Sequence, residues 1–307
     1  MTKGRPRFVH RGVANLNPAI GPRVRFDSIR ARGPREVNEG FVDAGGLNGA
    51  LLAMSFRDNQ GHHTTGSAVM IGPGLALCAA HVLHDEGYID RIQNNEAALV
   101  CTAPHEGGQL SLWTVARVTV IAETDLAILG MFLSSDAPLS DKFSSAEITT
   151  RMPSVGDELS LYGFSAHDRT QQRTSTINVS GEVHFARGKV TQVFPSGRDR
   201  VMLPGPCIEV NCNALGGMSG GPVFDHTGCL VGVVSSSFEG IAIAYVSHLW
   251  PALVRGIVEP VWPVGHVPGK GTLLYLGRKF GIVIERPDAF QLVVANGEPA
   301  FEYVAWS

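Results

Sequence analysis

The chain contains no long apolar run. No stretch of its 307 residues reaches the length of a membrane span, and the opening Met-Thr-Lys-Gly-Arg-Pro-Arg-Phe is followed by no apolar segment of signal-peptide length. The sequence therefore predicts a soluble, cytoplasmic protein with no membrane partner. The net charge of -3 also argues against a dedicated nucleic-acid or membrane binder.

The chain has few cysteines, and their spacing does not suggest pairs. An odd count of five makes a poor disulfide framework, and Cys207 and Cys212 lack the neighbouring ligands of a zinc site. We therefore expect small buried thiols and no metal site. The five are Cys78, Cys101, Cys207, Cys212 and Cys229.

Positive charge is concentrated in residues 1–45, which otherwise look irregular. Two interpretations stay open for this basic arm. It docks on the acidic remainder of its own chain, or it binds nucleic acid or another acidic partner. Its basic residues are Lys3, Arg5, Arg7, Arg11, Arg23, Arg25, Arg30, Arg32 and Arg35.

Short apolar runs separated by glycine-bearing breaks fill residues 46–255. This spacing is typical of an all-β barrel or sandwich, and no helical pattern alternates with the runs as a βαβ fold would require. Ser134–Pro153, rich in Ser, Asp and Pro, is predicted to connect two β units. The runs are Ala50–Phe56, Gly66–Ile71, Leu75–Ala80, Trp113–Ala122, Leu126–Phe132, Glu158–Phe164, Gly188–Phe194, Cys207–Asn211, Cys229–Ser235 and Ile241–Val246.

One helix is predicted over Val246–Gly256, where apolar residues recur at helical spacing. Ser247 is its expected N-cap, which places Pro251 within the first turn, where proline is tolerated. Residues 256–307 are predicted to form a small β extension. Its apolar runs are Leu273–Leu276, Ile282–Ile284, Gln291–Val294 and Phe301–Val304.

The segment Gly216-Gly217-Met218-Ser219-Gly220-Gly221-Pro222-Val223 places one serine among four glycines, directly before an apolar strand. Glycine permits backbone conformations that are strained for other residues. A serine in such a turn can project its hydroxyl while its own N–H and a nearby N–H point at one spot. That arrangement suits an acyl-transfer nucleophile with an oxyanion hole.

A serine nucleophile needs a base, and the base needs an orienting acceptor. His81 follows the apolar run Leu77-Cys78-Ala79-Ala80, and Asp125 opens the strongly apolar Leu126–Leu129. Taken singly, each could be structural, as a buried histidine and a turn or cap aspartate. A carboxylate at the start of an apolar strand is nevertheless costly without hydrogen-bond partners, and an imidazole N–H is one. The three residues together favour catalysis.

The segments Ala79-Ala80-His81, Thr124-Asp125-Leu126-Ala127-Ile128-Leu129 and Gly217-Met218-Ser219-Gly220-Gly221-Pro222 resemble the three motifs of the chymotrypsin/trypsin-like serine peptidases. The resemblance covers about residues 46–255 and is closer to bacterial, disulfide-free members than to digestive ones. It implies two six-stranded antiparallel β-barrels. The first would span 46–140, and 141–255 would hold the linker, the second barrel and the helix.

The resemblance also implies roles. Ser219 would attack the scissile carbonyl, His81 would transfer the proton and Asp125 would orient the imidazole, with an oxyanion hole from the N–H groups of Gly217 and Ser219. By the same match Ser235 would hydrogen-bond Asp125, and Ser235, Ser236 and Ser237 would present backbone to an extended protein or peptide substrate. No metal or organic cofactor is implied. An ordinary strand end remains the alternative for the three serines.

Two departures from the family pattern change the expected activation and selectivity. Met218 stands where secreted members often have an aspartate that pairs with a new N-terminus, and no Ile-Val-Gly-Gly segment precedes the first barrel. We expect no cleavage switch, so the oxyanion hole is either preformed or ordered by a partner protein. Asn213, beside Ala214, falls at the pocket floor, so we expect a neutral or small preference unless Glu239 reaches the pocket.

Other polar residues near these motifs are expected to lie outside the site. Adjacent His62 and His63 would point to opposite faces of a strand, which makes a poor chelate, and a solvated hairpin is expected there. Asp85, in the loop after His81, could compete with Asp125 as the residue that orients the imidazole. Because Asp85 lies only four positions after His81, we expect it to face solvent.

The sequence therefore predicts a serine endopeptidase, a hydrolase that works through an acyl-enzyme intermediate. Two alternatives remain. One is an impaired trypsin-like fold that binds peptides or partners. The other is a peptidase whose basic arm and C-terminal extension act as docking or sensing elements.

Overall fold

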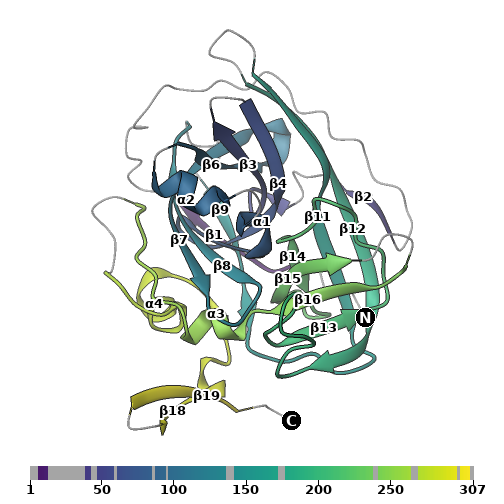
Figure 1. Ribbon diagram of the computed structural model, residues 1–307, viewed down its shortest axis with the longest axis vertical. Coiled ribbons are helices and arrows are strands. Elements are labelled where there is room, and N and C mark those ends of the chain that lie inside the picture. The colour runs from purple at the N-terminus through teal and green to yellow at the C-terminus, as the bar shows by residue number, and fades with distance from the viewer. Residues whose placement is uncertain are drawn as a thin grey trace.

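The computed structural model describes residues 6–12, 39–42, 47–58, 61–84, 87–94, 96–135, 142–171, 177–237, 241–263, 269–295 and 298–304. In these ranges the chain forms two β-barrels that lie side by side, with two short helices and a hairpin at one end (Figure 1). The expected pair of six-stranded antiparallel barrels is confirmed.

The first barrel closes in the order β3-β4-β5-β8-β7-β6. Its interior is filled by one face of each strand, because side chains alternate across a strand. Phe56, Met70 and Trp113 belong to this core and are at most 2% exposed. The strands are β3 (Leu51–Asp58), β4 (Gly61–Gly72), β5 (Leu75–Cys78), β6 (Ala98–Pro104), β7 (Leu110–Ile121) and β8 (Leu126–Leu133).

The second barrel closes through β14, which pairs with β11 on one side and β15 on the other. The remaining neighbours run β11-β12-β13-β16-β15, all antiparallel. The strands are β11 (Glu158–Gln171), β12 (Ile177–Phe194), β13 (Cys207–Val210), β14 (Pro222–Phe224), β15 (Leu230–Ser237) and β16 (Ala244–His248).

Two strands lie in the segment that the sequence marked as irregular. β1 (Phe8–Gly12) pairs with β9 (Lys142–Ala146) of the linker, and β2 (Glu39–Val42) pairs with β12. The backbone of Arg7 also bonds the linker, and its side chain forms an ion pair with Glu147. The expectation of an irregular arm is therefore wrong at these two strands, and this part of the arm docks on its own chain.

Short helices lie between or after the strands of the barrels. α1 (His81–His84) and α2 (Tyr88–Gln93) follow β5, η3 (Glu106–Gly108) joins β6 to β7, and α3 (Trp250–Val254) follows β16. The helix predicted from Val246 therefore starts later. Ser247 is not an N-cap, because it is buried in β16 opposite Cys207, whereas Pro251 does lie in the first turn of α3.

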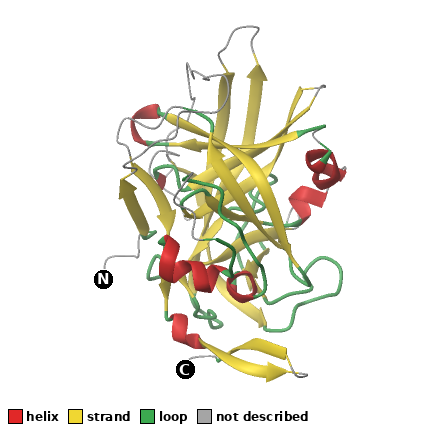
Figure 2. Cartoon of the chain, turned by 90° about the vertical axis from the view of Figure 1, so that its left-hand side faces the viewer, coloured by secondary structure: helices red, strands yellow, loops and turns green. Residues whose placement is uncertain are grey.

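The C-terminal segment mixes a helix with strands. Residues 273–276, expected as a strand, lie in α4 (Leu273–Phe280), so that expectation is wrong. The Thr272 hydroxyl caps this helix by accepting the N–H of Tyr275, and Gly281 ends it in the left-handed conformation. β17 (Ile284–Glu285), η4 (Pro287–Ala289) and the hairpin of β18 (Phe290–Ala295) and β19 (Glu298–Tyr303) follow, the hairpin lying at one end of the molecule (Figure 2).

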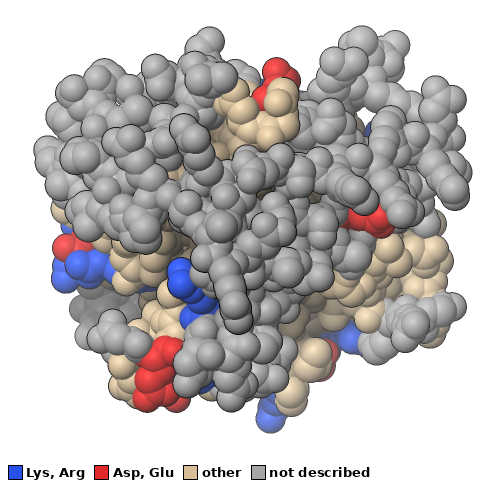
Figure 3. Space-filling model, turned by 90° about the horizontal axis from the view of Figure 1, so that it is seen from above, with Lys and Arg blue, Asp and Glu red and all other residues tan. Residues whose placement is uncertain are grey.

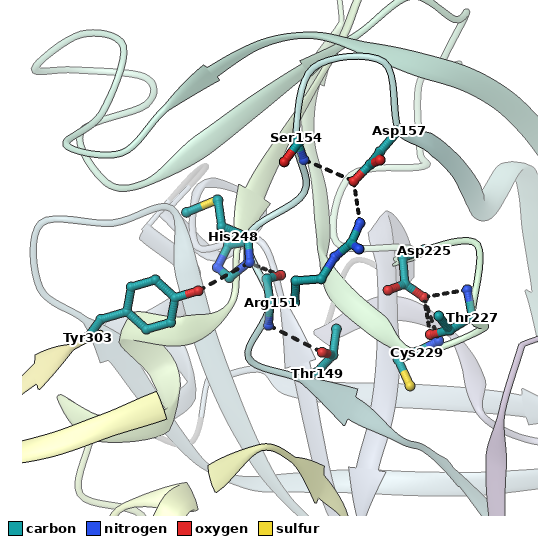
Figure 4. Close-up of polar contacts among 10 residues, drawn as sticks. Thr149, Arg151, Ser154, Asp157, Asp225, Thr227, Cys229, His248 and Tyr303 are labelled. Carbon is teal, nitrogen blue, oxygen red and sulfur yellow. Dashed lines mark hydrogen bonds and ion pairs between the residues drawn. The ribbon is translucent and has the colours of Figure 1, made fainter. Parts of the chain in front are cut away.

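The linker between the barrels is held by the C-terminal hairpin and by the end of β16. Tyr303 donates its Oη–H to the Thr150 carbonyl at 2.7 Å and accepts the Met152 N–H at 3.2 Å. Nε2 of buried His248 lies 3.2 Å from the Arg151 carbonyl, and Arg151 pairs with Asp157 (Figure 4). Directly before these contact residues lies β10 (Ile148–Thr149), parallel to both β15 and β17.

All five cysteines are free and buried, as expected. In Figure 3 the described basic and acidic side chains are interspersed over one face rather than gathered by sign. Among the described residues, no helix is long and apolar enough to cross a membrane.

Candidate active site

His81 and Asp125 meet although they lie 44 residues apart. His81 is the first residue of α1, directly after the buried Ala79 and Ala80, whose small side chains leave room for the ring. Its Nδ1 lies 2.9 Å from Asp125 Oδ2, and its backbone N–H donates to Asp125 Oδ1 at 2.8 Å. The Asp125 carboxylate thus fixes both the ring and the backbone of His81.

Asp125 is placed by a tight turn between β7 and β8. Glu123 adopts a left-handed φ of 56°, and the Thr124 hydroxyl donates to the Ile121 carbonyl at 2.8 Å. The carboxylate is 6% exposed and takes a further hydrogen bond from the Ser235 hydroxyl. Three donors therefore satisfy a charge that would otherwise be costly to bury.

Ser219 lies in the turn of residues 215–221, here called the nucleophile turn. Two glycines shape it, Gly217 with φ 91° and Gly220 with φ 84°, a region that other residues rarely adopt. The Ser219 hydroxyl donates to the Ser235 carbonyl at 3.1 Å. Because Ser235 also bonds Asp125, one residue of β15 joins the serine to the aspartate–histidine pair. The three sequence-predicted residues are thus brought to one place.

Two backbone donors beside Ser219 are available to a ligand. Met218 N–H bonds the Leu215 carbonyl at 3.1 Å, and with φ 91° at Gly217 this closes a type II turn. Among the residues that the structure describes, the N–H groups of Gly217 and Ser219 have no acceptor. These are the two N–H groups that the sequence assigned to an oxyanion hole.

Met218 is buried rather than paired with a charge. Its side chain is 0% exposed, belongs to the core of the second barrel, and accepts the Leu215 N–H at its sulfur at 3.2 Å. A Cβ on Gly163 would lie 2.7–2.9 Å from Met218, so the neighbouring strand must be glycine there. The inner side of the nucleophile turn is therefore anchored by packing.

The residues assigned to substrate binding lie on two segments that flank Ser219. Ser236 and Ser237 continue β15 and are half-buried, while Asn213 is exposed on the other segment. The Ser237 hydroxyl joins the two segments by donating to the Ala214 carbonyl at 2.8 Å. Glu239 lies outside the described residues.

The remaining candidates do not join the site. His62 and His63 are in β4, paired with Arg57 and Phe56, rather than in the turn itself. His84 ends α1, and Asp85 and Glu86 lie outside the described residues.

One residue that sequence reasoning missed is Ser67 of β4. Its N–H donates to the Ser219 carbonyl at 2.8 Å and its hydroxyl to the Gly217 carbonyl at 2.9 Å. The only signal in the sequence is the preceding Gly66, whose absent Cβ leaves room for the Ser219 carbonyl. A Gly-Ser pair in an apolar strand does not by itself indicate a contact with a distant turn.

One family of known proteins matches most of this architecture. The family model for the trypsin-like peptidase domain matches residues 66–233, more than half of the chain, so the chain belongs to that family. The match contains all three predicted motifs.

Solved structures resemble the chain at low identity. The inactive form of Rv3671c from M. tuberculosis, a serine-to-alanine mutant, is 16% identical, with a TM-score of 0.41, and the match covers 72% of this chain and 91% of that one. Deg5 is 15% identical with a TM-score of 0.43, over 64% of this chain and 83% of that one. No curated protein matches the chain.

Proposed function

We propose that the protein is a serine endopeptidase in which Ser219 is the nucleophile, His81 the general base and acid, and Asp125 the residue that orients the imidazole. The observation that carries this proposal is the contact of the Asp125 carboxylate with His81 Nδ1 at 2.9 Å, from a carboxylate that Ser235 also bonds. The backbone carbonyl of Ser235 in turn accepts a hydrogen bond from the Ser219 hydroxyl.

The Asp125 contact determines which imidazole nitrogen is basic. The Asp125 carboxylate accepts a hydrogen bond from Nδ1–H, so the lone pair of neutral His81 is on Nε2. As a substrate carbonyl approaches, the Ser219 proton passes from its bond with the Ser235 carbonyl to His81 Nε2. The imidazolium that forms is stabilised by the buried carboxylate and later protonates the leaving amine.

The N–H groups of Gly217 and Ser219 would stabilise the oxyanion. Both lack an acceptor among the described residues, so binding a developing negative charge breaks no existing hydrogen bond of theirs. Preorganised donors of this kind are a large part of enzymatic rate enhancement, and loss of one typically lowers turnover about 10²–10³-fold. Water then attacks the acyl-enzyme by the same proton path in reverse.

The proposed peptidase needs no activation by amino-terminal cleavage. Met218 is buried in apolar surroundings and offers no charge to a new terminal amine. The uncut chain is therefore expected to be active, with no metal or organic cofactor.

A fluorophosphonate probe tests the proposal on the full-length chain. The wild type should label at one serine, whereas Ser219→Ala should not label and His81→Ala should label at least ~10³-fold more slowly, because its base is missing. A matched control is Ser154→Ala, which removes an exposed hydroxyl outside the site and should label like the wild type. Failure of the wild type to label while it still binds peptides would instead favour a binding module.

The Ser237–Ala214 hydrogen bond supports a preference for small, uncharged side chains before the scissile bond. It links the two segments between which such a side chain must enter. A peptide-library profile should show small neutral residues at this position, and Ser237→Gly should admit larger ones. A profile dominated by Arg would contradict this selectivity without affecting the proposed chemistry.

A further inference from the structure

Ser67 is a fully buried serine of the first barrel whose hydroxyl and N–H both reach the second barrel. Its hydroxyl donates to the Gly217 carbonyl at 2.9 Å and accepts the Phe164 N–H at 2.9 Å. Its backbone N–H donates to the Ser219 carbonyl at 2.8 Å. A hydroxyl has one donor and can accept as well, so both functions are used here.

The two backbones approach so closely that only glycine fits on either side. A Cβ on Gly66 would lie 2.7 Å from the Ser219 carbonyl oxygen, and one on Gly220 would overlap the Ser67 carbonyl oxygen. The contact between β4 and the nucleophile turn is therefore part of the fold itself, with no side chain between the two backbones.

Ser67 fixes the peptide between Gly217 and Met218. The C=O and N–H of one trans peptide point in opposite directions. Here the C=O accepts the Ser67 hydroxyl at 2.9 Å while the N–H donates to Leu215 at 3.1 Å. Both ends of this peptide plane are thus held.

Ser67 fixes the peptide between Ser219 and Gly220 in the same way. Its C=O accepts the Ser67 N–H at 2.8 Å, and its N–H donates to the Val234 carbonyl at 2.7 Å. The Met218–Ser219 peptide lies between these two held peptides and carries the Ser219 N–H. Its Met218 carbonyl accepts the Gly221 N–H at 2.8 Å. The direction of the Ser219 N–H is therefore set by its neighbours.

We propose that Ser67 is a positioning residue for the oxyanion hole: from the first barrel, its hydroxyl holds the nucleophile turn so that the N–H groups of Gly217 and Ser219 converge without an activating ion pair. This rests on the proposed peptidase function. Loss of the hydroxyl removes the donor to the Gly217 carbonyl and the Ser67 acceptor of the Phe164 N–H, so the turn can reorient while strand β15 keeps its own contacts.

The test compares Ser67→Ala with Ser55→Ala. Ser55 is also buried in the first barrel, and its hydroxyl bonds the Val100 carbonyl at 3.5 Å. For Ser67→Ala we expect kcat to fall about 10–100-fold, KM to change less than about threefold, and affinity for a peptide boronate to fall with kcat/KM. Ser55→Ala should leave kcat and boronate affinity near the wild-type values.

Two further variants separate positioning from folding. Ser67→Cys keeps nearly the same volume with a weaker donor and should also lose turnover, whereas Ser67→Thr keeps the hydroxyl and should recover most of it. Thermal unfolding identifies any variant that fails to fold. The kinetics of the folded variants then show whether Ser67 positions the oxyanion hole. Equal kcat in the wild type and in folded Ser67→Ala or Ser67→Cys would overturn the inference. Absence of labelling and hydrolysis in the wild type would overturn the proposed function instead.

Discussion

At the scale of single residues, Asp125 is the most constrained side chain of the candidate site. It is 6% exposed and bonds His81 twice and Ser235 once. One group therefore orients the imidazole and, through Ser235, also contacts strand β15. Replacing it should affect the chemistry far more than the fold, because an amide keeps the shape and most of the hydrogen bonds.

We expect Asp125→Asn to lower kcat by about 10⁴-fold with little change in KM, because an amide NH₂ facing Nδ1 cannot accept a hydrogen bond from Nδ1–H and so favours the tautomer with the proton on Nε2. Steady-state kinetics on a peptide substrate measures this. Asp157→Asn, which alters an aspartate of the linker cluster, is the control. A loss of less than about tenfold would remove Asp125 from the proposed role.

Two buried histidines should make the protein less stable in acid. Burial lowers the pKa of His248 to about 4, although its bond to the Arg151 carbonyl opposes this, and burial lowers the pKa of His105 to about 4. Above pH 6.5 both are neutral in the folded and unfolded states. As pH falls from 6.5 to 4 only the unfolded state gains their protons, so stability falls, by up to about 1.4 kcal/mol per pH unit for each group.

Urea unfolding at about pH 7 and about pH 5 tests this expectation. The wild type should lose stability between the two, and His105→Asn should lose less, because one of the two groups is gone. The free energy of unfolding is compared within each variant, so a general destabilisation by the substitution cancels. An identical loss in the wild type and the variant would contradict the assignment to His105.

Two residues of the proposed triad could be selected from the sequence as candidates because each lies in a distinctive local context. Ser219 is surrounded by glycines, and Asp125 opens an apolar strand. Ser67 could not be predicted, since its importance arises from a close approach between β4 and the nucleophile turn, with Ser67 and Gly217 150 positions apart. Tertiary contacts of this kind leave only a glycine as a local trace.

At the scale of elements, capping residues determine the secondary structure of a segment whose apolar pattern is ambiguous. Four apolar residues starting at Leu273 are too few to distinguish a strand from a helix. Thr272 and Gly281 supply the N-cap and the left-handed end that make the segment helical. The start of α3 was misplaced for a related reason, because Val246 and Ser247 complete the barrel in β16 and cannot also begin a helix.

The hairpin β18–β19 stabilises the linker through Tyr303. Tyr303→Phe removes the hydroxyl that bonds Thr150 and Met152 but keeps the stack on Trp250, whose ring lies 5.6 Å away between centroids. We expect a loss of about 1–2 kcal/mol in the free energy of unfolding. Tyr275→Phe is the control, since its exposed hydroxyl bonds only Lys279 among the described residues. Equal effects of the two changes would contradict a specific role for Tyr303.

At the scale of the whole molecule, one apolar cluster joins the barrels and the C-terminal segment. It contains Leu77 and Ile128 of the first barrel, Phe224 and Val233 of the second, and Leu276 of α4. Because these residues share one core, the barrels and the C-terminal segment should unfold together rather than in turn.

We expect Leu276→Ala to lower the free energy of unfolding by about 2–4 kcal/mol, because Leu276 is 0% exposed and α4 cannot fully close the gap. Tryptophan fluorescence and far-ultraviolet circular dichroism should still report one coincident transition. Separate transitions would show that the barrels and the C-terminal segment are independent units.

The five cysteines are all buried and unbridged, and burial raises the pKa of the Cys207 and Cys229 thiols to about 11. Maleimide reagents attack thiolates at the surface, so the native chain should give almost no background with them. A single cysteine introduced at exposed Val294 would then carry a fluorophore or spin label on the C-terminal hairpin, without prior removal of the native thiols.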